Sequence, residues 1–142
     1  MPALSLRKSR TIIRKTLEHG KAQGFRPLAV VVLDDGGNVK AFEREDDAAP
    51  GRFAIAHGKA YGAIMLGMPG SAQKARAEEQ AYFMQAVNGA YGGQVIPVPG
   101  GVLLRDKRGR IVGAIGVTGD TSENDAAAGL AGVEAAGLVG EA

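Results

Sequence analysis

His57 is a residue of this chain with a wide chemical range, because a neutral imidazole binds metal ions and also transfers protons near neutral pH. Helical spacing through the segment 52–66 places it on the same side as Tyr61, Ile64 and Met68. An imidazole among apolar and aromatic side chains suits a metal ligand, or a general acid or base, in a ligand pocket. The alternative is a packed or surface histidine whose ring bonds a backbone carbonyl, and the sequence leaves both interpretations open.

Three cationic side chains are further candidates. His19 falls on the last turn of the first expected helix, where a cation also favours the negative end of the helix dipole, so capping competes with ligand binding there. Lys59 and Arg52 lie on the same expected helix as His57, and each could meet a carboxylate. For Lys59 an ordinary surface lysine is an equal alternative.

A stiff, glycine-containing loop is a candidate for a pocket wall. It contains Pro99, Gly100 and Gly101, and proline fixes the backbone there. In the expected strand that follows, Gly113 and Gly116 indicate that another segment passes close to the backbone. For these two glycines, the packing of a helix on the sheet is the favoured explanation.

Other chemical patterns have a sufficient structural explanation. Carboxylates cluster in a turn, in a loop and at a helix start, at 34–35, 45–47 and 120–125. Paired carboxylates catalyse hydrolysis only when two converge in one cleft, and each of these groups has a local role instead. Ser71 and Lys74 have the spacing of some acyl-transfer enzymes, but Ser71 also suits a helix N-cap. No nucleophile elbow, zinc-protease helix or phosphate loop occurs in the sequence.

Composition narrows the function classes. The 142 residues contain no cysteine, which excludes disulfides, thiolate metal ligands and a cysteine nucleophile. No apolar run approaches the ~18 residues of a membrane span. No long apolar leader is present, because the segment 1–4 runs directly into charged residues, so we expect a cytoplasmic protein without a membrane partner. Basic residues gather at 7–15 without interleaved aromatic ones, which favours a solvated helix face and not a nucleic-acid partner.

Hydrophobic periodicity and turn residues divide the chain into helices and strands. Helices are expected at 5–23, 52–66, 71–88 and 123–138. Strands are expected at 28–33, 39–44, 101–105 and 110–117, and 94–98 is either a short edge strand or an extended loop. Tight turns make both strand pairs antiparallel. We therefore expect one α+β domain over residues 1–142, with helices packed on an antiparallel sheet.

The helix expected at 71–88 has details that a structure can test. Ser71 is expected to be its N-cap and Gly89 to follow its end. The same spacing predicts that its buried side carries Ala75, Tyr82 and Ala86.

Two long segments of the chain resemble a known family. They read LAVVVLDDGGNVKAFEREDDAAPGRFAIAHGKAYGA and PVPGGVLLRDKRGRIVGAIGVTGDTSENDAAAGLAG. In these motifs and their order, residues 28–135 are similar to the GlcG/HbpS-type haem-binding family, which is related to the C-terminal domain of PduO-type cobalamin adenosyltransferases. The chain departs from the family pattern at Arg52, where a small residue is usual, and at Gly62, where threonine is usual.

The resemblance implies a profilin-like sheet of five antiparallel strands, assembly into homo-oligomers, and haem binding. Family members are often labelled haem-degrading, and others belong to operons for glycolate or diol metabolism. Because cysteine is absent, haem iron would be held here by His, Met or Tyr. His57 is the first candidate ligand, with Tyr61 beside it, and His19 is the second. Lys59 and Arg52 would then meet haem propionates.

The residues and the resemblance are compatible with three functions. The first is a haem or related tetrapyrrole binder that scavenges, senses or slowly breaks down its ligand. The second is a metabolic enzyme or accessory protein for a small organic carboxylate, with Lys59 and Arg52 as anion anchors and His57 as acid or base. The third is a structural oligomer with a vestigial pocket. The sequence assigns no catalytic residue.

Overall fold

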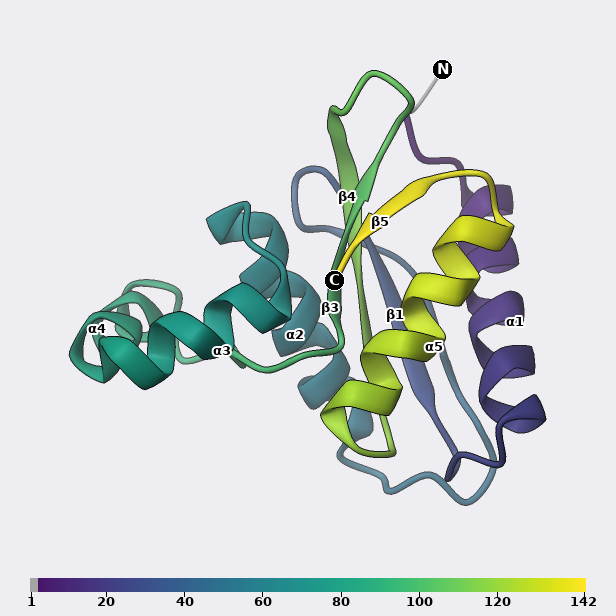
Figure 1. Cartoon of the computed structure of the whole chain (residues 1–142), viewed down its shortest axis with the longest axis horizontal. Helices are drawn as coiled ribbons and strands as arrows, with labels where there is room; N and C mark the ends of the chain where they lie inside the picture. The colour runs from purple at the N-terminus through teal and green to yellow at the C-terminus, as the bar shows by residue number, and fades with distance from the viewer. Residues whose placement is uncertain (1–2) are drawn as a thin grey trace.

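The computed structural model describes residues 3–142 and contains one sheet of five strands, shown in Figure 1. The spatial order is β2-β1-β4-β3-β5, and every neighbouring pair is antiparallel. The bounds are β1 Ala29–Asp34, β2 Val39–Arg44, β3 Gly101–Arg105, β4 Ile111–Thr118 and β5 Val139–Glu141. The prediction of an α+β fold with five antiparallel strands is confirmed.

Both hairpins form where their turn residues predicted them. In the β1–β2 turn, the Asp34 carboxylate accepts hydrogen bonds from the backbone N–H groups of Gly36 and Asn38, and Gly37 has a φ of +82°. Asp106 accepts two backbone N–H groups in the same way in the β3–β4 turn. Because an aspartate organises each turn locally, the sequence alone places these four strands to within one residue.

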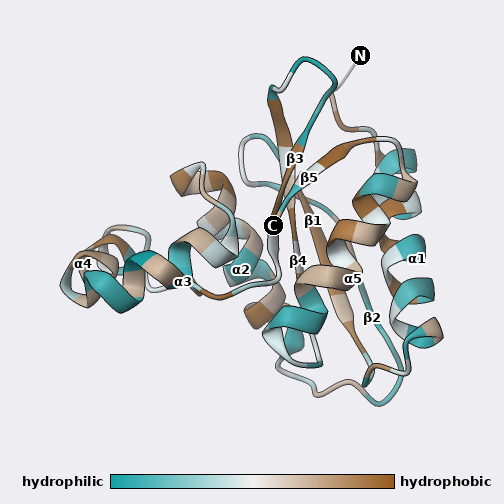
Figure 2. Cartoon of the chain, in the orientation of Figure 1, coloured by the Kyte–Doolittle hydropathy of each residue, from teal (hydrophilic) through white to brown (hydrophobic). Residues whose placement is uncertain are grey.

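Helices cover the two faces of the sheet unequally. α1 (Leu6–Ala22) and α5 (Ser122–Ala135) lie together on one face, and α2 (Arg52–Leu66) covers the other. The inner strand β1, coloured largely as hydrophobic in Figure 2, lies between β2 and β4 and is buried along nearly all of its length. A large core cluster fills the α1–α5 side, and a smaller one that contains four alanines fills the α2 side. Within residues 3–142, no helix is long and apolar enough to cross a membrane.

Small residues bring the helices close to their neighbours. A Cβ at Gly116 of β4 would collide with the backbone carbonyl oxygen of Ala56 in α2. A Cβ at Gly132 of α5 would collide with the Thr16 hydroxyl in α1. The interpretation of Gly116 as a helix-packing residue is therefore confirmed.

The segment expected as one helix at 71–88 consists of two helices that project from the sheet as an arm (Figure 1). They are α3 (Gly70–Glu79) and α4 (Ala81–Ala90), and the chain bends between them at Gln80, whose φ is −138° and ψ is 65°. The prediction of one helix was wrong because neither glycine nor proline marks this bend. Ser71 is not the N-cap either: Pro69 holds that position, and the Ser71 hydroxyl donates to the backbone oxygen of Ala142 at 2.9 Å.

The side of the arm that was expected to be buried is exposed. This prediction was wrong for Ala75, Tyr82 and Ala86, and Tyr82 is 71% exposed. Among the helices and strands described, α4 packs only on α3, while α3 also contacts α2 and β3. The arm therefore offers apolar side chains to solvent because no other part of the described chain covers them.

The C-terminal end of the chain also differs from the prediction. The helix expected to continue to 138 ends at Ala135, and Gly137 has a φ of +84°. β5 then pairs with the edge of β3 as the fifth strand. The segment 94–98 is extended chain and not a strand, and the backbone N–H of Ile96 donates to the carbonyl oxygen of Gly58 in α2 at 3.2 Å.

Candidate functional site

Aromatic rings form a continuous row along one side of α2. We call this group the aromatic row: Phe42, Phe53, His57, Tyr61 and Tyr91. Successive ring centroids are 4.8, 5.7, 5.4 and 6.0 Å apart. Phe53, His57 and Tyr61 are spaced by four residues on α2, so they share one side of the helix. Phe42 comes from β2 and Tyr91 follows α4, so the row extends from an edge strand to the arm.

His57 lies in the middle of the aromatic row. Its ring is nearly parallel to both neighbours, at 29° to Phe53 and 21° to Tyr61. Partial burial lowers the pKa of His57 below its ordinary value, and no hydrogen bond from residues 3–142 to its ring opposes this shift. The imidazole is therefore neutral at pH 7, with a nitrogen lone pair that the described protein does not use. The alternative of a histidine bonded to a backbone carbonyl does not describe this side chain.

Part of the aromatic row is open to solvent. Phe53 is 42% exposed, and His57 and Tyr61 are half-buried. Contiguous exposed aromatic surface is typical of sites that bind a ligand or a protein partner. The sequence identified His57 and Tyr61 on one side of this helix. It assigned Phe53 to the side of Ala56 and Ala60 instead, although Phe53 stacks on His57. It also missed Phe42 and Tyr91, which come from distant segments and carry no local signal for joining the row.

Lys59 does not lie in the aromatic row with His57. Its side chain is buried, and its ammonium nitrogen Nζ donates to the carbonyl oxygen of Val117 at 2.9 Å and to Oδ2 of Asp125 at 3.1 Å. Two residues along an α-helix correspond to roughly half a turn, which explains why the two side chains diverge. The charge of Lys59 is thus engaged inside the protein and is not offered to an external carboxylate.

Arg52 and the proline–glycine loop also lie on the Lys59 side of α2. The Arg52 guanidinium donates to the Thr118 hydroxyl at 3.0 Å and remains partly exposed. Pro99, Gly100 and Gly101 are buried. A Cβ at Gly100 would lie 2.9 Å from the Lys59 side chain, and one at Gly101 would collide with its backbone oxygen. The loop therefore forms a close packing contact with α2, and the structure does not place it beside His57.

His19 occupies the opposite side of the molecule. It lies on α1, and its ring meets Phe25 edge-on at a centroid distance of 6.2 Å. Because α1 and α2 cover opposite faces of the sheet (Figure 1), His19 and His57 of one chain cannot bind the same metal ion. Within residues 3–142, no group of three or more His, Asp or Glu side chains is arranged to hold a metal ion.

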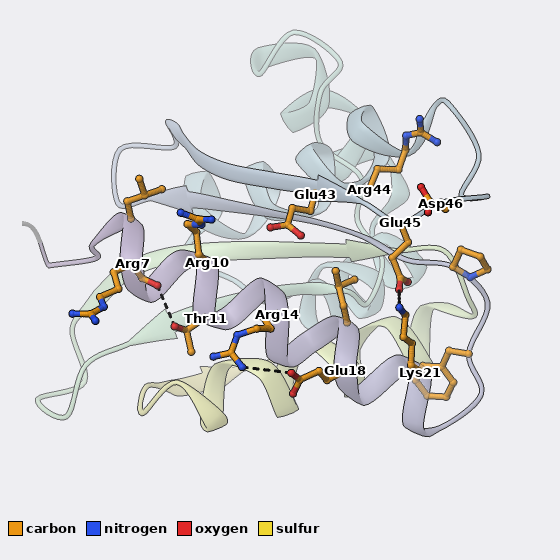
Figure 3. Close-up of a pocket in the computed structure, with 14 residues that line it drawn as sticks. Arg7, Arg10, Thr11, Arg14, Glu18, Lys21, Glu43, Arg44, Glu45 and Asp46 are labelled. Carbon is orange, nitrogen blue, oxygen red and sulfur yellow. Dashed lines mark hydrogen bonds and ion pairs between the residues drawn. The ribbon is translucent and has the colours of Figure 1, made fainter.

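A groove of about 1010 Å³ lies between α1 and β2, on the face opposite to the aromatic row (Figure 3). Its walls are charged: Arg7, Arg10, Arg14 and Lys21 come from α1, and Glu43 and Glu45 come from β2 and the residue that follows it. The sequence did not predict this groove, because the basic residues at 7–15 were interpreted as a solvated helix face. Their spacing alone does not show which strand lies opposite.

The chain matches a known protein family over most of its length. Residues 4–134 match the family described as haem degrading protein HbpS-like, and the chain belongs to this family. A relative from Citrobacter freundii, described as an uncharacterized 15.0 kDa protein in the dhaT-dhaS intergenic region, is 34% identical over 101 residues. That match covers 70% of this chain and 68% of the relative.

Solved structures share the fold. The crystal structure of a PduOC:heme complex has a TM-score of 0.85 at 21% identity, with 96% of each chain covered. A double mutant of HbpS from Streptomyces reticuli has a TM-score of 0.79 at 26% identity, covering 95% of this chain and 88% of that chain. The protein ORFY from Klebsiella pneumoniae has a TM-score of 0.83 at 22% identity, covering 96% of this chain and 92% of that chain. The resemblance inferred from the motifs is confirmed.

Proposed function

We propose that this protein binds haem on the aromatic row and that His57 is the iron ligand. The observation that carries the proposal is the stacked, half-buried imidazole, whose lowered pKa keeps it neutral and whose ring makes no hydrogen bond within residues 3–142. Membership of the HbpS-like family supports the choice of ligand, and so does the haem bound by PduOC, which has the same fold.

The chemistry of the row fits a tetrapyrrole. A neutral imidazole is a common axial ligand of haem iron, and the rings of Phe53 and Tyr61 extend an apolar surface on either side of it. Lys59 is paired internally, and Arg52 lies on the same side of α2 as Lys59 and donates to the Thr118 hydroxyl, so α2 presents no cation beside His57 for a propionate. Bound haem would supply the iron for oxygen chemistry, and the protein would hold and desolvate it. Scavenging, sensing and slow haem breakdown are all compatible with such a site.

The alternative function, binding of a small organic carboxylate beside His57, loses its main anchor. It relied on Lys59, which is buried against Asp125 and Val117. Arg52, the other anchor, lies on the same side of α2 as Lys59.

We also propose that the protein is a cytoplasmic homo-oligomer. The arm supports the oligomer, because Tyr82 is 71% exposed, and Phe83 is 37% exposed although the Arg76 guanidinium lies over one face of its ring. The absence of cysteine supports the location, since the chain needs no oxidising compartment for disulfides. Sedimentation of the purified protein as a monomer would refute the homo-oligomer. Recovery of the protein outside the cytoplasm in cell fractionation would refute the location.

The test of haem binding is a hemin titration followed by absorbance. We expect a saturable Soret band with equimolar haem in the wild-type protein. His57→Phe keeps an aromatic ring in the row but removes the ligand, so we expect its affinity to fall about tenfold or more, equivalent to ~1.4 kcal/mol. Tyr61→Phe and His19→Ala are matched controls that should bind as the wild type does. Equal binding by His57→Phe would refute His57 as the ligand, and a linear response in every variant would refute specific binding.

A further inference from the structure

The groove between α1 and β2 exists because two helices cannot cover five strands. Helices pack about 8–10 Å apart, whereas neighbouring strands are about 4.8 Å apart, so a pair of helices covers roughly four strands. α1 and α5 pack on each other, and the inner side of the edge strand β2 is left partly uncovered. The resulting space of about 1010 Å³ is at the upper end of the range of small-molecule sites, ~300–1,000 Å³.

One end of the groove is cationic. Arg7, Arg10 and Arg14 lie one turn apart along α1 and line the groove (Figure 3). Arg14 pairs with Glu18 at 3.4 Å, but neither Arg7 nor Arg10 has a carboxylate oxygen within 4.0 Å in residues 3–142. Their guanidinium groups point in different directions (Figure 3), and each has N–H groups whose hydrogen bonds a carboxylate can accept.

The other end of the groove is apolar at its base. Leu17 and Phe25 line it together with Pro27, while the charges near them are already paired: Lys21 meets Glu45 at 3.7 Å, and Glu45 also accepts the backbone N–H of Leu28 at 2.7 Å. At a rise of about 1.5 Å per residue, the seven residues from Arg10 to Leu17 correspond to roughly 10 Å along α1. The cationic and apolar ends are therefore separated by about the length of a medium-chain acyl group.

We propose that this groove binds an amphipathic carboxylate, with its head group on Arg7 and Arg10 and its apolar body on Leu17, Phe25 and Pro27. Glu43 stands across the groove from Arg10 (Figure 3) and opposes an anion there. Glu43 lowers the affinity of the groove for an anion, because a carboxylate ligand must compete with it for the arginines. The site is independent of the haem site proposed at His57, since the two lie on opposite faces of the sheet.

The test uses decanoate as the probe and calorimetry or NMR titration as the measurement, with the full chain. We expect saturable decanoate binding that weakens about tenfold or more in Arg7→Gln/Arg10→Gln, equivalent to ~1.4 kcal/mol. Glu43→Gln should strengthen it several-fold. Arg108→Gln, an exposed cation in the β3–β4 turn, should leave it unchanged. Decyltrimethylammonium, which has a similar chain and the opposite charge, should bind more weakly than decanoate.

The outcomes separate the two proposed sites. Decanoate binding that ignores both arginine substitutions, or equal binding of decyltrimethylammonium, would overturn the groove proposal. Decanoate binding that is retained in His57→Phe would support the groove as a second site. Hemin binding that is lost in Arg7→Gln/Arg10→Gln but kept in His57→Phe would overturn the proposed haem site at His57 and would leave the decanoate result to decide the groove.

Discussion

Lys59 of α2 and Asp125 of α5 form an ion pair inside the protein, although their helices cover opposite faces of the sheet. Nζ lies 3.1 Å from Oδ2, and the two side chains are 3% and 2% exposed. Nζ also donates to the carbonyl oxygen of Val117, and Oδ1 of Asp125 accepts the backbone N–H of Asp120 at 2.9 Å. The pair therefore ties α2, β4 and the start of α5 together.

Burial acts against both charges of this pair. It lowers the pKa of Lys59 and raises the pKa of Asp125, and in each case the charge of the partner opposes the shift. Each group is tolerated in the interior because the other is there.

We expect Lys59→Met to destabilise the fold by about 3–5 kcal/mol, because it leaves a buried carboxylate without its cation. Urea unfolding measures the free energy. Lys59→Met/Asp125→Leu should recover most of the loss. Lys74→Met, which removes an exposed lysine paired with Glu78, should change stability far less. Equal effects of Lys59→Met and Lys74→Met would contradict the structural role of the pair.

Haem affinity is expected to depend on pH through His57. Iron binds the neutral imidazole, so protons compete with haem. Because the pKa of His57 is lowered in the folded protein, affinity should stay constant above about pH 6.5 and fall only as the pH drops through the lower, folded value. Hemin titrations between pH 4.5 and 8 measure this, with His57→Phe as the control. A loss of affinity that begins above pH 7 would mean that another group controls binding.

The sequence predicted the elements whose signals are local. Asp34 and Asp106 organise their turns through bonds to residues two and four positions away, so both hairpins could be placed from the sequence. The bend at Gln80 could not be predicted, because neither glycine nor proline marks it. The strand Val139–Glu141 could not be predicted either, because β5 forms only where β3 offers a free edge.

The candidate site shows the same limit. The four-residue spacing of His57 and Tyr61 predicted their shared side of α2, and they are stacked. The partner of Lys59 lies 66 residues away in sequence, and no periodicity connects the two. For the same reason the arginines of α1 could not be assigned to a groove before β2 was placed beside them.

Asp120 should contribute to acid stability. Its carboxylate accepts the backbone N–H of Arg26 at 2.8 Å and the side-chain amide of Asn124 at 2.7 Å, and these bonds hold its pKa well below the usual range. A lowered carboxyl pKa adds stability above the unfolded value of about 3.9, and this stability is lost as the pH falls further.

Asp120→Asn should therefore lower the melting temperature at pH 7, and its difference from the wild type should shrink below about pH 4. Asp35→Asn, in the exposed β1–β2 turn, is the matched control and should behave as the wild type. A melting-temperature difference for Asp120→Asn that is the same at every pH would show that charge is not the cause.

Gly116 allows α2 to pack closely on β4, and the substitution Gly116→Ala tests this close approach with one added methyl group. In Gly116→Ala the new Cβ would collide with the carbonyl oxygen of Ala56 and lie 3.0 Å from the backbone nitrogen of Ala60. Backbone atoms cannot rotate away, so α2 must shift, and overpacking of this kind typically costs about 1–3 kcal/mol. Because α2 carries His57, haem affinity should fall together with stability. Gly89→Ala, in a helical position with nothing within 4 Å, should instead stabilise by roughly 0.5–1 kcal/mol. A Gly116→Ala protein that melts and binds hemin as the wild type does would mean that α2 does not approach β4 this closely in solution.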